Sequence, residues 1–388
     1  KREKRGKVER MKNSLVSNST VSYVNEIIET GINERASDIH ISSDETDGME
    51  IKYRIDGILQ EVEELFDVID KKILERNVVE IISRIKILSE MNVAEKRKPQ
   101  DGSFSFLLDE KRYDVRVAYM PTINGESIVL RILKSFLENT ELKTLGFSNK
   151  SEEILEKMLE RKYGMILVSG PTGSGKSTTL LSMIEKLNDG KRKIITVEDP
   201  VENKIKGIIQ VQVNNEIGVT FSEVLKSCLR NDPDIIVVSE IRDEITAEIA
   251  VRAALTGHLV ISTIHTNNAI ATITRLVDMG IPKYLILDSM IGVVAQRLIG
   301  KKCDNYSNHL DKHSCNRCNN GYDGRIVINE ILYLNEEVKN ILKKNELGEK
   351  VKKEIKELET AKYIDFSMDV NEKIEKNLIF EKDAFEFS

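Results

Sequence analysis

The sequence predicts a mixed α/β protein in which a smaller α+β domain precedes a larger domain built on a parallel sheet. A wholly apolar run, Met165 to Val168, is followed by a glycine-rich segment and then by helical spacing of apolar residues. Between residues 193 and 300, further apolar runs alternate with helical patterns, as in a parallel sheet covered by helices. Residues 20–135 instead mix hairpin-type strands with two helical patterns, which is typical of an α+β domain.

The composition is that of an ordinary folded protein. The chain has 388 residues, of which 40% are hydrophobic and 31% charged, with a net charge of −6. This length suggests two or three domains, and the negative balance gives no support to a nucleic-acid partner. No apolar run approaches the roughly 20 residues of a membrane span, and we see no signal peptide. Four cysteines, three of them late in the chain, favour a reducing compartment over a disulfide framework.

The pattern divides the chain into six segments. Residues 1–19 are rich in Lys and Arg, and we interpret them as a solvated linker; an electrostatic arm for anionic lipid or nucleic acid is the alternative. Because the sequence begins at Lys1 rather than at a methionine, we expect a further segment upstream. The predicted segments are a basic linker over 1–19, an α+β domain over 20–135, a linker over 136–148, a nucleotide-binding domain over 149–300, a cysteine-containing segment over 301–325 and a helical segment over 326–388.

The first domain is expected to contain two helices and several paired strands. Apolar residues share one helical face between residues 21 and 31, and Asp56-Gly57 is a hairpin signal between two alternating runs. We expect helices over 21–31 and 72–88, a turn over 99–102, and strands over 37–41, 49–55, 58–62, 103–108, 112–119 and 126–133.

The second domain alternates strands and helices. The run Asp234 to Val238 is continuous and β-branched, which indicates a strand buried on both faces. We expect strands over 165–168, 193–197, 208–213, 234–238 and 259–264, and helices over 178–187, 221–230, 245–256, 269–279 and 285–299. Short helices are expected over 336–388.

The central motif lies between the first of these strands and its helix. Gly170 to Ser177 fits the pattern G-x-x-x-x-G-K-[ST], and the strand before it and the helix after it are the context of a phosphate-binding loop. Backbone N–H groups of such a loop surround nucleotide phosphates, the lysine reaches the β- and γ-phosphates, and the hydroxyl after it binds Mg²⁺. The predicted nucleotide-binding residues are Gly170, Pro171, Thr172, Gly173, Ser174, Gly175, Lys176, Ser177 and Thr178.

Polar residues follow three further strands of the same sheet. They are Glu198, Asp199 and Glu202 after one strand, Glu240 after the next and His265 after another. Each alone would be interpreted as a solvated cap or turn residue. Because the carboxyl ends of parallel strands meet at one edge, the group predicts a metal-nucleotide site with carboxylates for Mg²⁺ and for water.

Four blocks of this domain resemble a known family. They are Gly170 to Thr178, Ile195 to Glu202, Asp232 to Asp243, and Thr256 to Thr266. They are similar to the Walker A, Asp-box, Walker B and His-box motifs of the ATPases of type II secretion and type IV pilus systems. The first domain matches as well, at Arg35 to His40, Tyr53 to Gly57, Pro99 to Gly102, and Gly125-Glu126. Two departures are small: Ser239 and Asn268 replace the family's usual Gly and Asp.

The resemblance implies a hexameric ATPase with a PAS-like domain followed by a RecA-like domain. By carry-over, Glu202 is the general base for water, Glu240 acts with Ser177 at Mg²⁺, and His265 senses the γ-phosphate. Arg116 and Arg131 match the arginines that the family's small domain supplies to a neighbouring subunit's nucleotide. For each arginine, a surface ion pair is the alternative.

The cysteine region departs further from the family, whose assembly members hold zinc with two C-x-x-C pairs. Cys315 and Cys318 keep the second pair, but Tyr306 stands where the partner of Cys303 is expected. With His313, or alternatively His309, these three cysteines predict a Cys₃His zinc site. Loss of zinc, with the cysteines retained, is the alternative.

The function that the resemblance implies is a motor. ATP hydrolysis would drive an inner-membrane platform protein that assembles a type IV pilus or a type II secretion pseudopilus, from a cytoplasmic position at the inner face of the membrane. Its implied cofactors are ATP and Mg²⁺, with Zn²⁺ open, and its partners are other copies of itself and the platform, with no nucleic acid. The alternatives are a retraction-type or competence pseudopilus ATPase, or a nucleotide-dependent regulatory module with little turnover.

Overall fold

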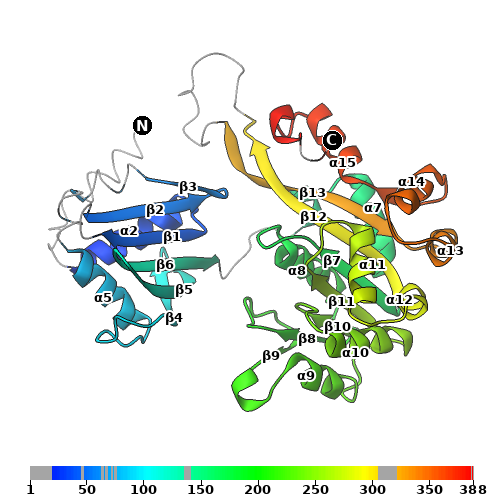
Figure 1. The fold of residues 1–388 in the computed structure, drawn as a ribbon, viewed down its shortest axis with the longest axis horizontal. Helices are drawn as coiled ribbons and strands as arrows, with labels where there is room; N and C mark the ends of the chain where they lie inside the picture. The colour runs from blue at the N-terminus through cyan, green and yellow to red at the C-terminus, as the bar shows by residue number, and fades with distance from the viewer. Residues whose placement is uncertain are drawn as a thin grey trace. The chain divides into compact units, whose positions relative to one another are not determined.

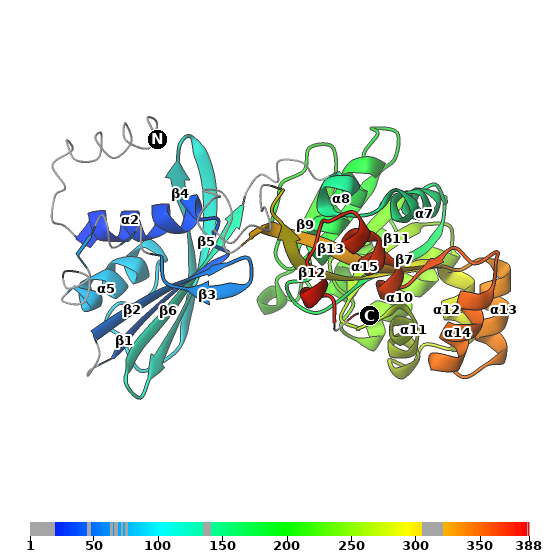
Figure 2. The same cartoon turned by 90° about the horizontal axis from the view of Figure 1, so that it is seen from above.

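The chain divides into two units, Lys1–Leu137 and Glu138–Ser388, each with its own sheet (Figures 1 and 2). The computed structural model describes residues 20–44, 48–62, 65, 69–70, 73, 77–134, 141–304, 321–385 and 387.

Within the described ranges, the first unit is a six-stranded antiparallel sheet, and two of its helices lie on one face (Figure 2). Its strand order is β3-β2-β1-β6-β5-β4. The apolar residues that alternate along the strands pack against the apolar faces of the helices, as Ile39 and Ile28 do in one core. Its elements are α2 (Thr20–Asn33), β1 (Asp38–Asp44), β2 (Gly48–Ile55), β3 (Ile58–Gln60), α5 (Val78–Leu88), β4 (Gln100–Leu108), β5 (Lys111–Thr122) and β6 (Gly125–Lys134).

Two turn predictions in this unit have different outcomes. The hairpin at Asp56-Gly57 is confirmed: both residues have positive φ, of 51° and 90°, and β2 pairs with β3 across them. The turn predicted over residues 99–102 is wrong in part, because β4 already begins at Gln100. Gly102 lies inside the strand because the chain passes very close to Ser89: a Cβ on Gly102 would lie 2.2 Å from that residue's carbonyl oxygen.

The second unit is an eight-stranded sheet in the order β14-β13-β12-β7-β11-β10-β8-β9. The six strands from β12 to β9 are parallel, and β13 and β14 are antiparallel additions at one edge. Its strands are β7 (Gly164–Ser169), β8 (Ile194–Glu198), β9 (Ile209–Gln212), β10 (Ile235–Val238), β11 (Leu259–Ile264), β12 (Met290–Lys302), β13 (Tyr322–Tyr333) and β14 (Tyr363–Ile364).

Helices cover both faces of this sheet (Figure 1). All six residues of β7 are buried, and they alternate between two cores: Met165 and Leu167 join one, whereas Ile166 and Val168 join the other. This double burial explains why the run is apolar throughout rather than alternating. The helical elements are α6 (Leu142–Leu145), α7 (Asn149–Leu159), α8 (Lys176–Leu187), η1 (Asn215–Ile217), α9 (Phe221–Cys228), α10 (Glu244–Leu255), α11 (Ala269–Asp278), α12 (Lys283–Ser289), α13 (Glu336–Lys344), α14 (Glu349–Glu357), α15 (Phe366–Glu375) and η2 (Glu381–Asp383).

One predicted helix is wrong. The pattern over residues 285–299 predicts a helix, but only α12 is helical, and β12 begins at Met290. Residues 290–296 are all buried, because β12 lies between β7 and β13 with cores on both faces. A fully buried strand has no alternation of polar and apolar residues, so its sequence resembles a buried helix.

In the described ranges, none of the helices has both the length and the apolarity needed to cross a bilayer. The short helices expected after residue 336 are found as α13, α14 and α15. A two-residue strand, β14, lies between the last two and extends the sheet beyond β13.

Candidate functional site

The glycine-rich loop connects β7 to α8, and its backbone needs glycine. Gly170, Gly173 and Gly175 have φ of 152°, 78° and 86°, which side-chain-bearing residues rarely adopt. A Cβ on Gly170 would lie 2.4 Å from the Ser174 hydroxyl oxygen and 2.5 Å from the Gln296 carbonyl oxygen. The loop is therefore shaped by packing against β12 as well as by its own sequence.

Lys176 begins α8 and is 9% exposed. Its ammonium donates to the Gly170 and Pro171 carbonyl oxygens, at 2.8 and 3.0 Å, so the side chain curls back over the loop. Burial lowers the pKa of Lys176; the Glu240 carboxylate opposes this shift, and the Arg297 guanidinium adds to it. The next residue, Ser177, is exposed, and so are Pro171, Thr172 and Gly173.

A chain of contacts joins three of the predicted site residues. Lys176 Nζ lies 3.4 Å from His265 Nδ1, and His265 Nε2 lies 3.0 Å from Glu240 Oε1. Because the carboxylate can only accept, the arrangement fits a neutral imidazole that donates from Nε2 and accepts at Nδ1. Arg242 Nε donates to the other oxygen of Glu240 at 2.9 Å. The strand ends of β7, β10 and β11 thus bring their polar groups together, as the strand order requires.

The acidic residues after β8 are arranged differently. Glu198 ends β8 and accepts hydrogen bonds from Thr196 at 2.5 Å and from Gln210 at 2.9 Å, so it holds β8 to β9. Glu202 is exposed in the loop that follows. Within the part of the chain that the structure describes, no hydrogen bond or ion pair joins Glu202 to Lys176, Glu240 or His265.

The two predicted arginines lie in the first unit, directly opposite each other on β5 and β6. Val115 and Val117 flank Arg116 and are buried in the core, so the arginines lie on the sheet face away from that core. Arg131 Nε donates to Asp38 Oδ1 at 2.8 Å. Burial alone would raise the pKa of Asp38, but hydrogen bonds from Arg131 and Ser37 outweigh it and lower the pKa. Arg131 thus lies on a strand, as predicted, and it also forms the surface ion pair that was the alternative, with Asp38.

The predicted zinc site lies almost wholly outside the described residues. Cys315, Cys318, His309 and His313 belong to that undescribed part, and Cys303 is buried just before it. Among the residues that the structure describes, no group of three His, Cys, Asp or Glu side chains is placed to hold a metal. The zinc site stays a prediction.

Two residues next to the loop were not predicted, because their sequence pattern indicated a helix. Gln296 and Arg297 are consecutive residues of β12, close to the ends of β7 and β11. Gln296 is fully buried, and its Nε2 donates to the Ser174 carbonyl oxygen at 2.7 Å. The signal available in the sequence was the polar pair Gln296-Arg297 directly after the apolar run 290–295. That pair indicates a site only when the run is known to be a strand that ends beside the loop.

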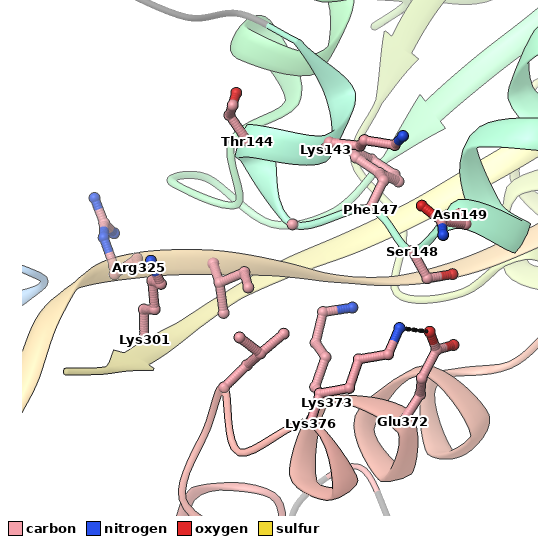
Figure 3. Close-up of a pocket in the computed structure, with 13 residues that line it drawn as sticks. Lys143, Thr144, Phe147, Ser148, Asn149, Lys301, Arg325, Glu372, Lys373 and Lys376 are labelled. Atoms are coloured by element: carbon pink, nitrogen blue, oxygen red, sulfur yellow. Dashed lines mark hydrogen bonds and ion pairs between the residues drawn. The ribbon is translucent and has the colours of Figure 1, made fainter. Parts of the chain in front are cut away.

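A separate cavity of about 440 Å³ lies elsewhere in the second unit (Figure 3). Its walls come from α6 and the start of α7, from β12 and β13, and from α15 (Figure 3). The basic side chains that line it are Lys143, Lys301, Arg325, Lys373 and Lys376. No predicted site residue lines this cavity, so it is distinct from the cluster around Lys176.

Comparisons with known proteins agree with this architecture. The family model described as "Type II/IV secretion system protein" matches residues 15–376. The chain is 46% identical over 283 residues to a protein of Pseudomonas aeruginosa called "Type II secretion system protein E", covering 73% of this chain and 55% of that one. It is 40% identical over 351 residues to a "Type II secretion system ATPase E" of Vibrio cholerae, covering 85% and 68%. The chain thus spans about half to two thirds of the length of these relatives.

Two solved structures share the fold over nearly the whole chain. The Legionella pneumophila ATPase DotB superposes with a TM-score of 0.69 at 25% identity, covering 93% of each chain. The pilus retraction motor PilT with bound ADP superposes with a TM-score of 0.62 at 29% identity, covering 94% of this chain and 96% of that one.

Proposed function

This chain belongs to the Type II/IV secretion system protein family, and on that premise we propose that it binds ATP with Mg²⁺ and hydrolyses it. The observation that carries the proposal is the contact chain from Lys176 through His265 to Glu240. If the glycine-rich turn were incidental, its lysine would be expected to lie in solvent. Lys176 is instead buried, with His265 beside it and Glu240 beside His265.

The donor groups at the loop fit a magnesium nucleotide. Hydroxyl and carboxylate oxygens are ligands that Mg²⁺ accepts, and Ser177 and Glu240 present one of each. Bound there, the ion would neutralise charge on the phosphate oxygens. The loop N–H groups and the N-terminus of α8 would bind the phosphates, and Lys176 would turn from its carbonyl partners toward them.

The remaining roles belong to side chains around the transferred phosphoryl group. We assign Glu202 as the base that orients and deprotonates the attacking water, since it is exposed in the loop between β8 and β9 and, among the described residues, no hydrogen bond or ion pair holds its carboxylate. With nucleotide bound, His265 would turn its single N–H from Glu240 to the γ-phosphate, and it would return that N–H to Glu240 when the phosphate is lost. Since no hydrogen bond or ion pair in the described part of the chain joins Glu202 to Lys176, His265 or Glu240, closure of its loop is part of the proposal.

We extend the proposal to an assembly of several copies, in the hexameric form implied by the resemblance. Arg116 and Arg131 would then complete the site of a neighbouring subunit by neutralising charge on the phosphoryl oxygens. Their position on the sheet face that does not carry the core supports this role. Turnover would thereby depend on assembly.

For the cellular role we propose a motor for assembly of a type IV pilus or a type II secretion pseudopilus, acting through a membrane platform protein at the inner face of the cytoplasmic membrane. The names of the relatives support a role in secretion, and the pilus retraction motor shows that the same fold also serves pili.

The test is phosphate release as a function of subunit concentration, with Lys176→Ala as the blank and molecular mass measured at each concentration. The proposal predicts a rate per subunit that rises as the assembly forms. A rate per subunit that stays constant while the mass changes would contradict sites completed by a neighbour, and no release above the blank in a fully assembled sample would contradict the ATPase.

A further inference from the structure

Two consecutive residues of β12 contact the two loops that carry the predicted chemistry. Gln296 and Arg297 point to opposite faces of the sheet, because side chains alternate along a strand. Gln296 bonds to the phosphate-binding loop, as described above. On the other face, Arg297 donates to the backbone oxygen and the side-chain oxygen of Asn267, both at 3.0 Å, and to its own neighbour's carbonyl oxygen at 2.9 Å. Asn267 lies two residues after His265.

A buried carboxylate holds the other end of the same segment. Glu330 on β13 is fully buried, and its Oε2 accepts from the backbone N–H of Ala269, the first residue of α11, at 3.2 Å. Its Oε1 accepts from the Tyr363 hydroxyl at 2.6 Å, and Lys352 lies 3.5 Å away. A buried charge is costly unless it is paired and hydrogen-bonded, so a carboxylate here needs these partners.

The two groups also act on each other. Burial lowers the pKa of the half-buried Arg297, and the Glu330 carboxylate opposes that shift. The Glu330 carboxylate thus supports the charge of the Arg297 guanidinium, while the two groups bind residues 267 and 269. Together they fix the segment from His265 to Ala269 against β12 and β13.

We propose that Arg297 and Glu330 are positioning residues for ATP hydrolysis, which hold segment 265–269 so that His265 stays between the phosphate-binding loop and Glu240. The inference rests on the proposed ATPase function. The geometry favours positioning over simple packing because Arg297 Nη2 bonds both oxygens of Asn267 while Nη1 is anchored on the Gln296 carbonyl oxygen of β12, which fixes the loop against the strand.

Replacement by lysine separates charge from geometry. Arg297→Lys keeps the positive charge but cannot bind three acceptors in a fixed fork. A displacement of a reacting group by about 1 Å costs up to about 100-fold in rate. We therefore expect kcat to fall by about 10-fold or more, with the KM for ATP within about twofold, because the substitution keeps the positive charge and leaves the Gln296 hydrogen bond to the phosphate-binding loop in place.

The experiment compares Arg297→Lys, Glu330→Gln and the double variant with wild type. The matched control is Arg252→Lys, which alters an exposed arginine of α10 whose partner is Glu248. Steady-state kcat and KM are measured together with hydrogen exchange of the amides of residues 265–272. Both single variants should lower kcat and speed exchange there, and the double variant should lose less than the product of the two, because both act through one segment.

Hydrogen exchange can be measured without ATP hydrolysis, so a failure of this inference can be distinguished from a failure of the proposed function. If wild type hydrolyses no ATP, the ATPase proposal fails, while faster exchange in the variants still supports positioning. An unchanged kcat with unchanged exchange would overturn the inference. A raised KM with unchanged kcat would also overturn it, since it would place Arg297 directly on the nucleotide. If Glu330→Gln does not fold, the half-buried Arg297→Lys carries the test.

Discussion

Glu240→Gln is the substitution that most sharply separates nucleotide binding from turnover. Glu240 is 16% exposed and lies between His265 at 3.0 Å and Arg242 at 2.9 Å. Glutamine keeps the length of the side chain and an oxygen that can accept from His265. What it removes is the negative charge that faces the loop and that opposes the lowered pKa of Lys176.

The magnitude follows from the role assigned to that charge. Loss of one preorganised electrostatic group at a reacting centre costs about 3 kcal/mol of transition-state stabilisation. At about 1.4 kcal/mol per tenfold, kcat should fall by about 100-fold or more. The effect on folding should be much smaller. Both ion-pair partners are more than a third exposed, so we expect a loss of about 1 kcal/mol or less in the free energy of unfolding.

The assay is phosphate release at saturating ATP and Mg²⁺, with binding of a fluorescent ATP analogue measured in parallel. Glu248→Gln is the matched control, because it makes the same chemical change in an exposed ion pair of α10. We expect the control to match wild type and Glu240→Gln to bind nucleotide without comparable turnover. Unchanged hydrolysis in Glu240→Gln would refute the assignment.

Three further substitutions test other contacts. Gln296→Leu removes the hydrogen bond to the phosphate-binding loop, and at about 1.4 kcal/mol for that bond, nucleotide affinity should fall by about tenfold in a titration; unchanged affinity would contradict the contact's role. Asp38→Asn should lower the free energy of unfolding by about 1 kcal/mol at pH 7, because it removes the partner of Arg131. Since the folded pKa of Asp38 is lowered, the difference from wild type should shrink as the pH falls through that value, and denaturation curves in which it grows would contradict the sign. Lys373→Met should cost about 3 kcal/mol, because it leaves the buried Asp369 carboxylate unpaired; a loss under about 1 kcal/mol in urea denaturation would contradict this.

Local sequence patterns predicted the structure correctly where a pattern is compatible with only one backbone conformation. The glycines of the phosphate-binding loop, the Asp56-Gly57 hairpin and the apolar run of β7 each have few alternatives, and the structure has them as predicted. The convergence of Lys176, Glu240 and His265 also followed from sequence, because it needs only the rule that parallel strands end at one edge. The contact partners themselves could not be predicted, since they depend on side-chain conformations.

Features that depend on contacts between distant parts of the chain could not be predicted from local patterns. Residues 290–296 are buried on both faces, so nothing in their pattern separates strand from helix, and the wrong choice hid the contacts of Gln296 and Arg297. The partners of Glu330 could not be predicted either. A lone carboxylate in an apolar run shows its partners only when α11, α14 and β14 are packed around it.

The most direct test of the central claim is release of inorganic phosphate from saturating ATP and Mg²⁺ by wild type and by Lys176→Ala, in samples of equal molecular mass. We expect steady turnover by wild type and none above background in the variant, which has lost the cation of the phosphate-binding loop. Equal turnover in the two proteins would contradict the claim that this loop is the site of hydrolysis.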